Sequence, residues 1–134
     1  RYSALSPFGL VPAALMGLNP AEILDDAEAA LADNATDEGP AYRLGALVGS
    51  NAKDGVDKLT ILAAPGWESV GLWLEQLVAE STGKHEKGVF PVAQEMIGAP
   101  DDYGRDRFFL AVRPPHEVSA EYERDVRALA DAGR

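Results

Sequence analysis

The chain of 134 residues contains no cysteine, so neither a disulfide framework nor a thiolate metal site is available to it. A composition without cysteine suits a reducing compartment, and we expect a cytoplasmic location. No apolar run approaches the length needed to span a bilayer, so we expect no membrane partner. Arg1 runs into helix-forming sequence without the cleavage region of a signal peptide, and the start reads as an internal cut in something longer.

Cations are scarce. Twelve Lys and Arg residues stand against 22 Asp and Glu, which gives a formal net charge of -10. This balance argues against a nucleic-acid partner, which needs a basic surface. It does not exclude a phosphorylated metabolite, because one local cluster of cations or backbone N–H groups holds a phosphate. With 46% hydrophobic residues, the chain is an ordinary globular protein of one domain's length, and we assign residues 1–134 to a single domain.

Helix signals dominate the first third of the chain. Ser6 and Asn19 each precede a proline, the pattern of a capping residue followed by proline at the first helical position. Gly17 stops the first of these two predicted helices. A third helix is predicted from Ala41 to Asp54, before Gly55.

Strands and helices alternate in the remainder. The predicted strands are Lys58–Ala63, Val89–Val92 and Arg107–Val112. The predicted helices are Glu68–Glu80 and Ala120–Ala132; their core residues are Val70, Trp73, Leu74 and Leu77 in the first, and Tyr122, Val126 and Leu129 in the second. The alternation predicts an α/β fold with a parallel sheet covered on both faces, and so few strands predict that the sheet is incomplete.

Gln76 and Glu80 are the leading pair of candidate site residues. Residues four apart on a helix are neighbours on its surface, so an amide lies beside a carboxylate near the predicted helix end. A positioned carboxylate is a suitable general base for proton transfer. A solvated polar helix face explains the same spacing, so the pair alone does not decide between the two.

Other chemically suggestive residues have simpler explanations. Lys84, His85 and Lys87 form a small basic cluster that fits either a phosphate contact or a solvated turn. His116 fits a strand-to-helix connection, and Trp67 fits packing. Neighbouring acids such as Asp25–Asp26 and Asp101–Asp102 lack metal-site spacing, so we predict no metal and no cofactor.

Two motifs together resemble one family. Arg1 opens the stretch Arg-Tyr-Ser-Ala-Leu-Ser-Pro-Phe-Gly-Leu-Val-Pro-Ala, and Glu80 to Lys84 read Glu-Ser-Thr-Gly-Lys. In glucose-6-phosphate isomerases, Gly-Gly-Arg-Tyr/Phe-Ser precedes a Gly-Leu-x-Pro-Ala helix, and Glu-Ser-x-Gly-Lys follows an amphipathic helix. The chain resembles this family most strongly from Arg1 to about Val92. The first stretch is also similar to the isomerase half of transaldolase/glucose-6-phosphate isomerase fusions.

The resemblance implies a three-layer α/β/α domain of the sugar isomerase (SIS) type with a flavodoxin-like parallel sheet. It implies interconversion of glucose 6-phosphate and fructose 6-phosphate through an enediol intermediate, with no metal. Glu80 matches the base, Arg1 the cation beside the intermediate, and Gln76 a substrate contact; Lys84 is a further candidate for binding substrate. In such folds, active groups gather at the carboxyl ends of strands and the adjoining helix ends.

Parts of the family's site are missing from the sequence. The two glycines before Arg1, the Ser/Thr-rich phosphate loop, the ring-opening histidine and the C-terminal lysine are not found. We therefore expect a fragment that is inactive alone, completed by the remainder of a parent isomerase, itself a homodimer. The rival interpretation is a non-catalytic SIS-type module that binds sugar phosphates and regulates a partner. The third is a structural α/β domain with no ligand.

Overall fold

The computed structural model describes residues 3–85, 87–116 and 118–134. The chain divides into two compact units, Arg1–Ala46 and Leu47–Arg134. The assignment of residues 1–134 to a single domain stays a prediction.

The first unit is helical. It holds α1 (Pro7–Leu15), α2 (Pro20–Asp33) and the start of α3 (Pro40–Lys53). The side chains of Ser6 and Asn19 accept hydrogen bonds from first-turn backbone N–H groups, as their positions before proline predict. Helices α1 and α2 contact each other, but no residue of either is buried.

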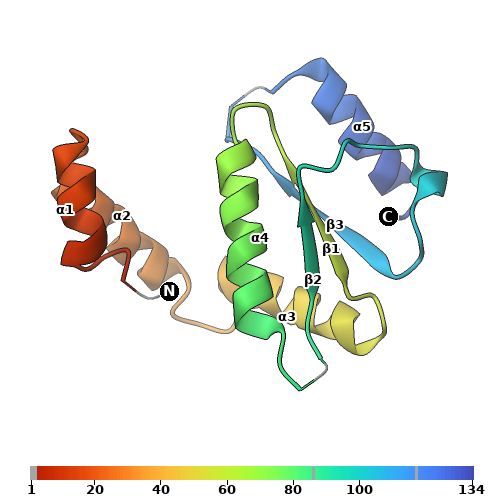
Figure 1. Cartoon of the computed structure of the whole chain (residues 1–134), viewed down its shortest axis with the longest axis horizontal. Coiled ribbons are helices and arrows are strands. Elements are labelled where there is room, and N and C mark those ends of the chain that lie inside the picture. The colour runs from red at the N-terminus through yellow and green to blue at the C-terminus, as the bar shows by residue number, and fades with distance from the viewer. Residues whose placement is uncertain (1–2, 86, 117) are drawn as a thin grey trace. The chain divides into compact units, whose positions relative to one another are not determined.

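The second unit is built on a three-stranded sheet, with all strands parallel (Figure 1). Strands β1 (Lys58–Ala63) and β3 (Arg107–Val112) have the predicted bounds, and β2 (Phe90–Ala93) lies one residue beyond its prediction. The strand order is β2-β1-β3. Among the described residues, the outer edges of β2 and β3 pair with no further strand, in keeping with an incomplete sheet.

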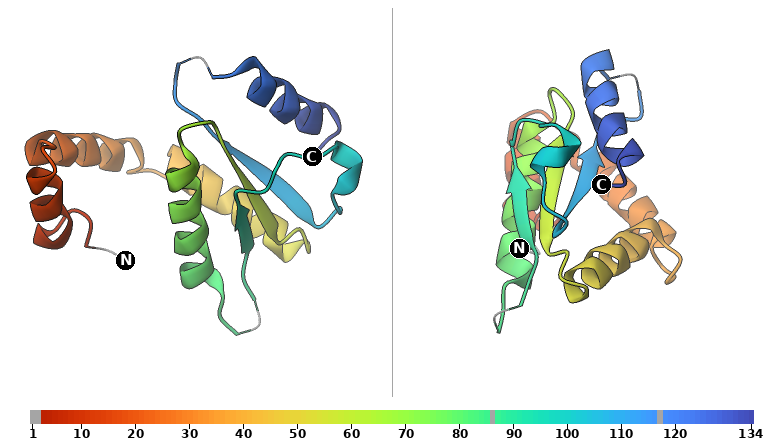
Figure 2. Two further views of the ribbon diagram at one scale, coloured as in Figure 1. Left: turned by 45° about the horizontal axis from the view of Figure 1, so that its top comes forward. Right: turned by 90° about the vertical axis from the view of Figure 1, so that its right-hand side faces the viewer.

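Helices cover both faces of this sheet. Helix α4 (Glu68–Thr82) packs on one face, together with the end of α3, and α5 (Ala120–Asp131) packs on the other (Figures 1 and 2). A short 3-10 helix, η1 (Pro100–Asp102), lies in the connection from β2 to β3. The predicted fold class is confirmed: the unit is α/β, with helices on both sides of a small parallel sheet, as expected for an incomplete α/β/α domain.

The core forms one cluster on each face. On the α5 face, the Tyr122 hydroxyl donates a hydrogen bond to the carbonyl of Leu62 at 2.7 Å. Tyr122 and Leu129 are buried and Val126 packs against them, which confirms the predicted inner face of this helix. The buried residues of the α5 face are Leu62, Ala64, Tyr103, Tyr122 and Leu129, and those of the α4 face are Leu59, Ile61 and Val89.

The predicted orientation of Trp73 is wrong. Trp73 is 58% exposed, whereas Leu74 and Val78 of the same helix pack against the core. The reason is the buried Gly71, where an added Cβ would lie 3.1 Å from the side chain of Ala63. This close approach turns the stripe of positions 71, 74 and 78 towards the sheet, and position 73 lies beside that stripe. The other predicted core residues of α4, Val70, Leu74 and Leu77, are half-buried.

Candidate functional site

Gln76 and Glu80 lie on the exposed surface near the carboxyl end of α4. The Gln76 side-chain Nε2 donates a hydrogen bond to Glu80 Oε1 at 3.3 Å. The pairing expected from their spacing is therefore present. Because the amide holds one carboxylate oxygen, it restricts the rotation of the group that would act as a base.

The Thr82 hydroxyl joins the carboxyl end of α4 to the segment just before β2. The Thr82 Oγ1 accepts a hydrogen bond from the backbone N–H of Val89 at 3.2 Å and donates one to the carbonyl of Val78 at 3.0 Å. Val89 immediately precedes β2, so the last turn of α4 lies at the start of that strand. The position of Glu80 relative to the sheet therefore depends on Thr82.

The site residues of α4 lie at the amino edge of the sheet, meaning the edge where the strands begin. Helix α4 descends from the end of β1 to the start of β2, opposite to the strand direction (Figure 1). Glu80 and Lys84 therefore lie at the edge opposite the carboxyl ends of the strands, and their role as active groups stays a prediction. The physical reason is that a single helix joining two parallel strands must return the chain to the starting edge.

Lys84 stands in the turn between α4 and β2, four residues after Glu80. Its backbone N–H donates to the carbonyls of Thr82 and Lys87, and the side chain is exposed. His85, the next residue, has φ 55° and is exposed, as expected of a residue in a tight turn. The structure thus places Gln76 and Glu80 on successive turns of α4, and Lys84 just beyond the end of that helix.

Arg1 lies outside the described residues. Its predicted convergence with Glu80 in one cleft stays a prediction. His116 is exposed in the connection between β3 and α5, as expected from the sequence.

One pocket at the carboxyl edge of the sheet is acidic. It has a volume of about 380 Å³ and is lined by Glu68, Glu121 and Asp125, and by no cation among the described residues. Hydrogen bonds from its own backbone N–H and from that of Gly66 lower the pKa of Glu68, so its carboxylate is charged at neutral pH. Such a lining repels a phosphate.

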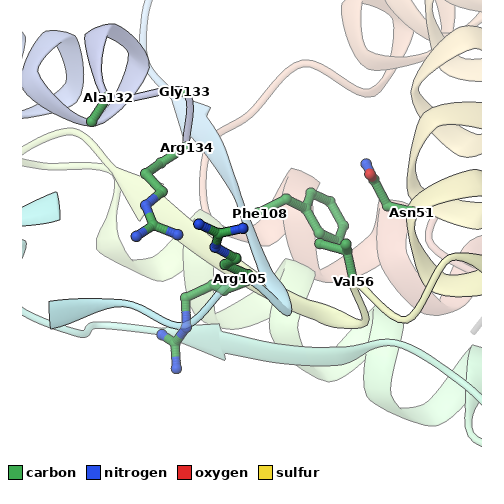
Figure 3. A pocket seen from close by; sticks show the side chains of 8 residues that line it. Asn51, Val56, Arg105, Phe108, Ala132, Gly133 and Arg134 are labelled. Carbon is green, nitrogen blue, oxygen red and sulfur yellow. The ribbon is translucent and has the colours of Figure 1, made fainter. Parts of the chain in front are cut away.

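The amino edge also holds a pocket that the sequence analysis missed. Its volume is about 580 Å³, and three arginines line it: Arg105 and Arg107 around the start of β3, and Arg134 after α5 (Figure 3). The sequence offered one signal, the cluster Arg-Asp-Arg directly before an apolar strand. Its convergence with Arg134, distant in sequence, could not be seen there.

Two further features are absent from the part of the chain that the structure describes. No group of three or more His, Asp or Glu side chains there is arranged to hold a metal ion. No helix in the same part is long and apolar enough to cross a membrane.

Comparison with known proteins gives one consistent result. Over 137 aligned residues, the chain is 31% identical to "Glucose-6-phosphate isomerase" of Bacillus cereus (strain AH187), 31% to that of Bacillus anthracis and 30% to that of Bacillus cytotoxicus. Each match covers 92% of this chain. This similarity confirms the predicted resemblance to the glucose-6-phosphate isomerase family.

The match is to one part of these enzymes. The chain spans about 30% of the length of the curated glucose-6-phosphate isomerases it matches. No family model matches the chain, and no solved structure matches it. The chain is therefore consistent with a fragment of a glucose-6-phosphate isomerase.

Proposed function

We propose that this chain supplies part of the active site of an enzyme that interconverts glucose 6-phosphate and fructose 6-phosphate. Similarity to glucose-6-phosphate isomerases supports the reaction class, since these relatives are named for this isomerisation. The observation that carries the proposal is the hydrogen bond from Gln76 to Glu80, which positions a carboxylate on an exposed helix face. The chain would fold as an SIS-type domain within a homodimeric cytoplasmic parent.

The proposed reaction moves one proton between two neighbouring carbons and one between their oxygens, and it needs no external oxidant. Glu80 takes a proton from the carbon beside the sugar carbonyl, and the electron pair of that C–H bond forms the double bond of an enediol(ate). The same carboxyl group then returns a proton to the neighbouring carbon, and the carbonyl forms again at the other position. Gln76 holds the carboxylate in line for both transfers, a positioning effect that lowers the entropic part of the barrier.

The two cations have electrostatic roles in this proposal. Arg1 offsets the negative charge that develops on the enediolate oxygens. Lys84, four residues after Glu80 and just beyond the end of α4, attracts the anionic substrate. The groups for phosphate binding and ring opening come from the rest of the parent, so the 134-residue chain alone has little or no activity.

The decisive experiment is Glu80→Gln in the parent enzyme. The variant should lose exchange of the proton at the second sugar carbon with solvent deuterium, followed by NMR, while fructose 6-phosphate still binds. Glu75→Gln is the matched control, because it makes the same charge change one residue from Gln76. Retained exchange in Glu80→Gln would remove Glu80 from the base role.

An assay of the unmodified parent distinguishes the rival function from the proposed one. A non-catalytic module that regulates a partner would bind fructose 6-phosphate without producing glucose 6-phosphate in a coupled assay. Turnover by the parent, with none from the 134-residue chain, would support the proposal as stated.

A further inference from the structure

The amino-edge pocket has the chemistry of an anion site. Besides Arg105, Arg107 and Arg134, it is lined by the side-chain amide of Asn51, and no Asp or Glu is among its described lining residues. The sequence has 22 Asp and Glu residues and 12 Lys and Arg residues, so a lining with three cationic side chains and no acidic side chain is unusual for this chain. The acidic pocket at the carboxyl edge has the opposite charge, since acids and no cation are among its described lining residues.

The neighbouring carboxylates are already paired with other cations. Lys58 Nζ contacts Asp57 Oδ1 at 3.0 Å and Asp106 Oδ2 at 2.9 Å. Arg107 forms an ion pair with Glu95, so much of its charge is compensated within the fold. These pairings account for Asp106, the acid next to Arg105 in the sequence.

Arg105 and Arg134 are not compensated in this way. Within residues 3–85, 87–116 and 118–134, Arg105 makes no ion pair, and the Arg134 guanidinium donates only to the carbonyl of Gly104, at 3.4 Å. Figure 3 shows both side chains extending into the pocket. Two guanidinium groups that share one pocket repel each other unless an anion lies between them.

The end of α5 fixes Arg134 in place. Gly133 has φ 71°, and its N–H bonds the carbonyl of Ala130 at 3.0 Å, while the N–H of Arg134 bonds that of Leu129 at 2.9 Å. This glycine-containing ending satisfies carbonyls that would otherwise face the pocket and disfavour an anion. The helix dipole explains a cation at this end, but it does not explain Arg105 on the opposite wall.

We propose that Arg105 and Arg134 form a binding site for a phosphate group at the amino edge of the sheet. Guanidinium groups bind phosphate oxygens in pairs of parallel hydrogen bonds. Val56 and Phe108 give the pocket an apolar wall, which suits a phosphate ester as well as the free ion. The proposal does not depend on isomerase activity.

The test is titration of the 134-residue chain with inorganic phosphate at constant ionic strength, followed by NMR and calorimetry. We expect saturable shifts at Arg105, Gly133 and Arg134. Each of Arg105→Gln and Arg134→Gln should weaken binding by about tenfold or more, the usual worth of a hydrogen bond to a charged group. Arg124→Gln is the control, because it makes the same charge change on α5 at an exposed residue that pairs with Asp125.

A second titration with glucose 6-phosphate identifies the source of the phosphate group. Equal affinity for the two ligands assigns the site to the phosphate group alone, and tighter binding of the sugar phosphate assigns it to an ester. If a glutamine variant unfolds, Arg105→Lys keeps the charge, loses the paired hydrogen bonds and should bind with intermediate affinity. Absence of saturable binding, or equal weakening by Arg124→Gln, would overturn the proposal.

Discussion

The hydroxyl of Tyr122 donates a 2.7 Å hydrogen bond to the carbonyl of Leu62, which joins α5 to the central strand. Both residues are buried, and they belong to the same cluster. Burial also raises the pKa of Tyr122, since the ionised phenolate is disfavoured away from water. One side chain therefore couples helix packing, strand hydrogen bonding and a pH response.

Removing this hydroxyl should destabilise the second unit. Tyr122→Phe leaves the buried carbonyl of Leu62 without its partner, and we expect a loss of about 1–2 kcal/mol in the free energy of unfolding. Urea unfolding monitored by circular dichroism measures the change. Tyr42→Phe is the control, because Tyr42 is 60% exposed, and its effect should be close to zero.

The same variant should change how steeply the free energy of unfolding falls at alkaline pH. The folded-state pKa of Tyr122 is raised, so the folded chain retains a proton that the unfolded chain releases above the ordinary value of 10.0. Stability should therefore fall as pH rises through that value, and the fall should be shallower in Tyr122→Phe. Parallel slopes for the two proteins above pH 10.0 would contradict this account.

Gly71 sets the distance between α4 and β1. A Cβ at this position would lie 3.1 Å from the side chain of Ala63, so a larger residue pushes the helix from the sheet. Gly71→Val should lower the free energy of unfolding by about 1–3 kcal/mol. Gly49→Val in α3 is the matched control, since nothing lies within 4 Å of its added Cβ, and it should be neutral or slightly stabilising.

Local signals in the sequence predicted the elements well. Ser6 and Asn19 cap the helices they were expected to cap, and β1 and β3 have their predicted bounds. These features depend on a few adjacent residues, so a single sequence contains the information. The pairing of Gln76 with Glu80 is equally local, because it needs only the period of one helix.

Features that depend on distant contacts were missed. Trp73 faces outward because Gly71 approaches Ala63, a contact between separate elements. The arginine pocket joins Arg105 to Arg134, which only the folded chain brings together. The position of Glu80 at the amino edge was available from the sequence, since a strand-helix-strand order already reverses the helix.

The ion pair of Lys58 with Asp106 should contribute to the loss of stability at acid pH. A hydrogen bond from Lys58 lowers the pKa of Asp106, so the folded carboxylate stays charged below its ordinary value of 3.8. Its contribution is present above that value and is lost as pH falls through the lower folded-state pKa. Asp106→Asn should therefore flatten the loss of stability in acid, whereas Asp101→Asn should not. Unfolding by urea at several pH values between 2 and 5 measures the difference.

Thr82 provides the last test, because it links the fold to the proposed chemistry. Thr82→Val removes the acceptor for the N–H of Val89 and should cost about 1–2 kcal/mol in the free energy of unfolding. In the parent enzyme, the loosened end of α4 would misplace Glu80 and lower kcat by about tenfold to a hundredfold. Thr82→Ser keeps the hydroxyl and should retain both stability and turnover. A valine variant that loses stability but keeps kcat would show that the anchoring of α4 does not position the base.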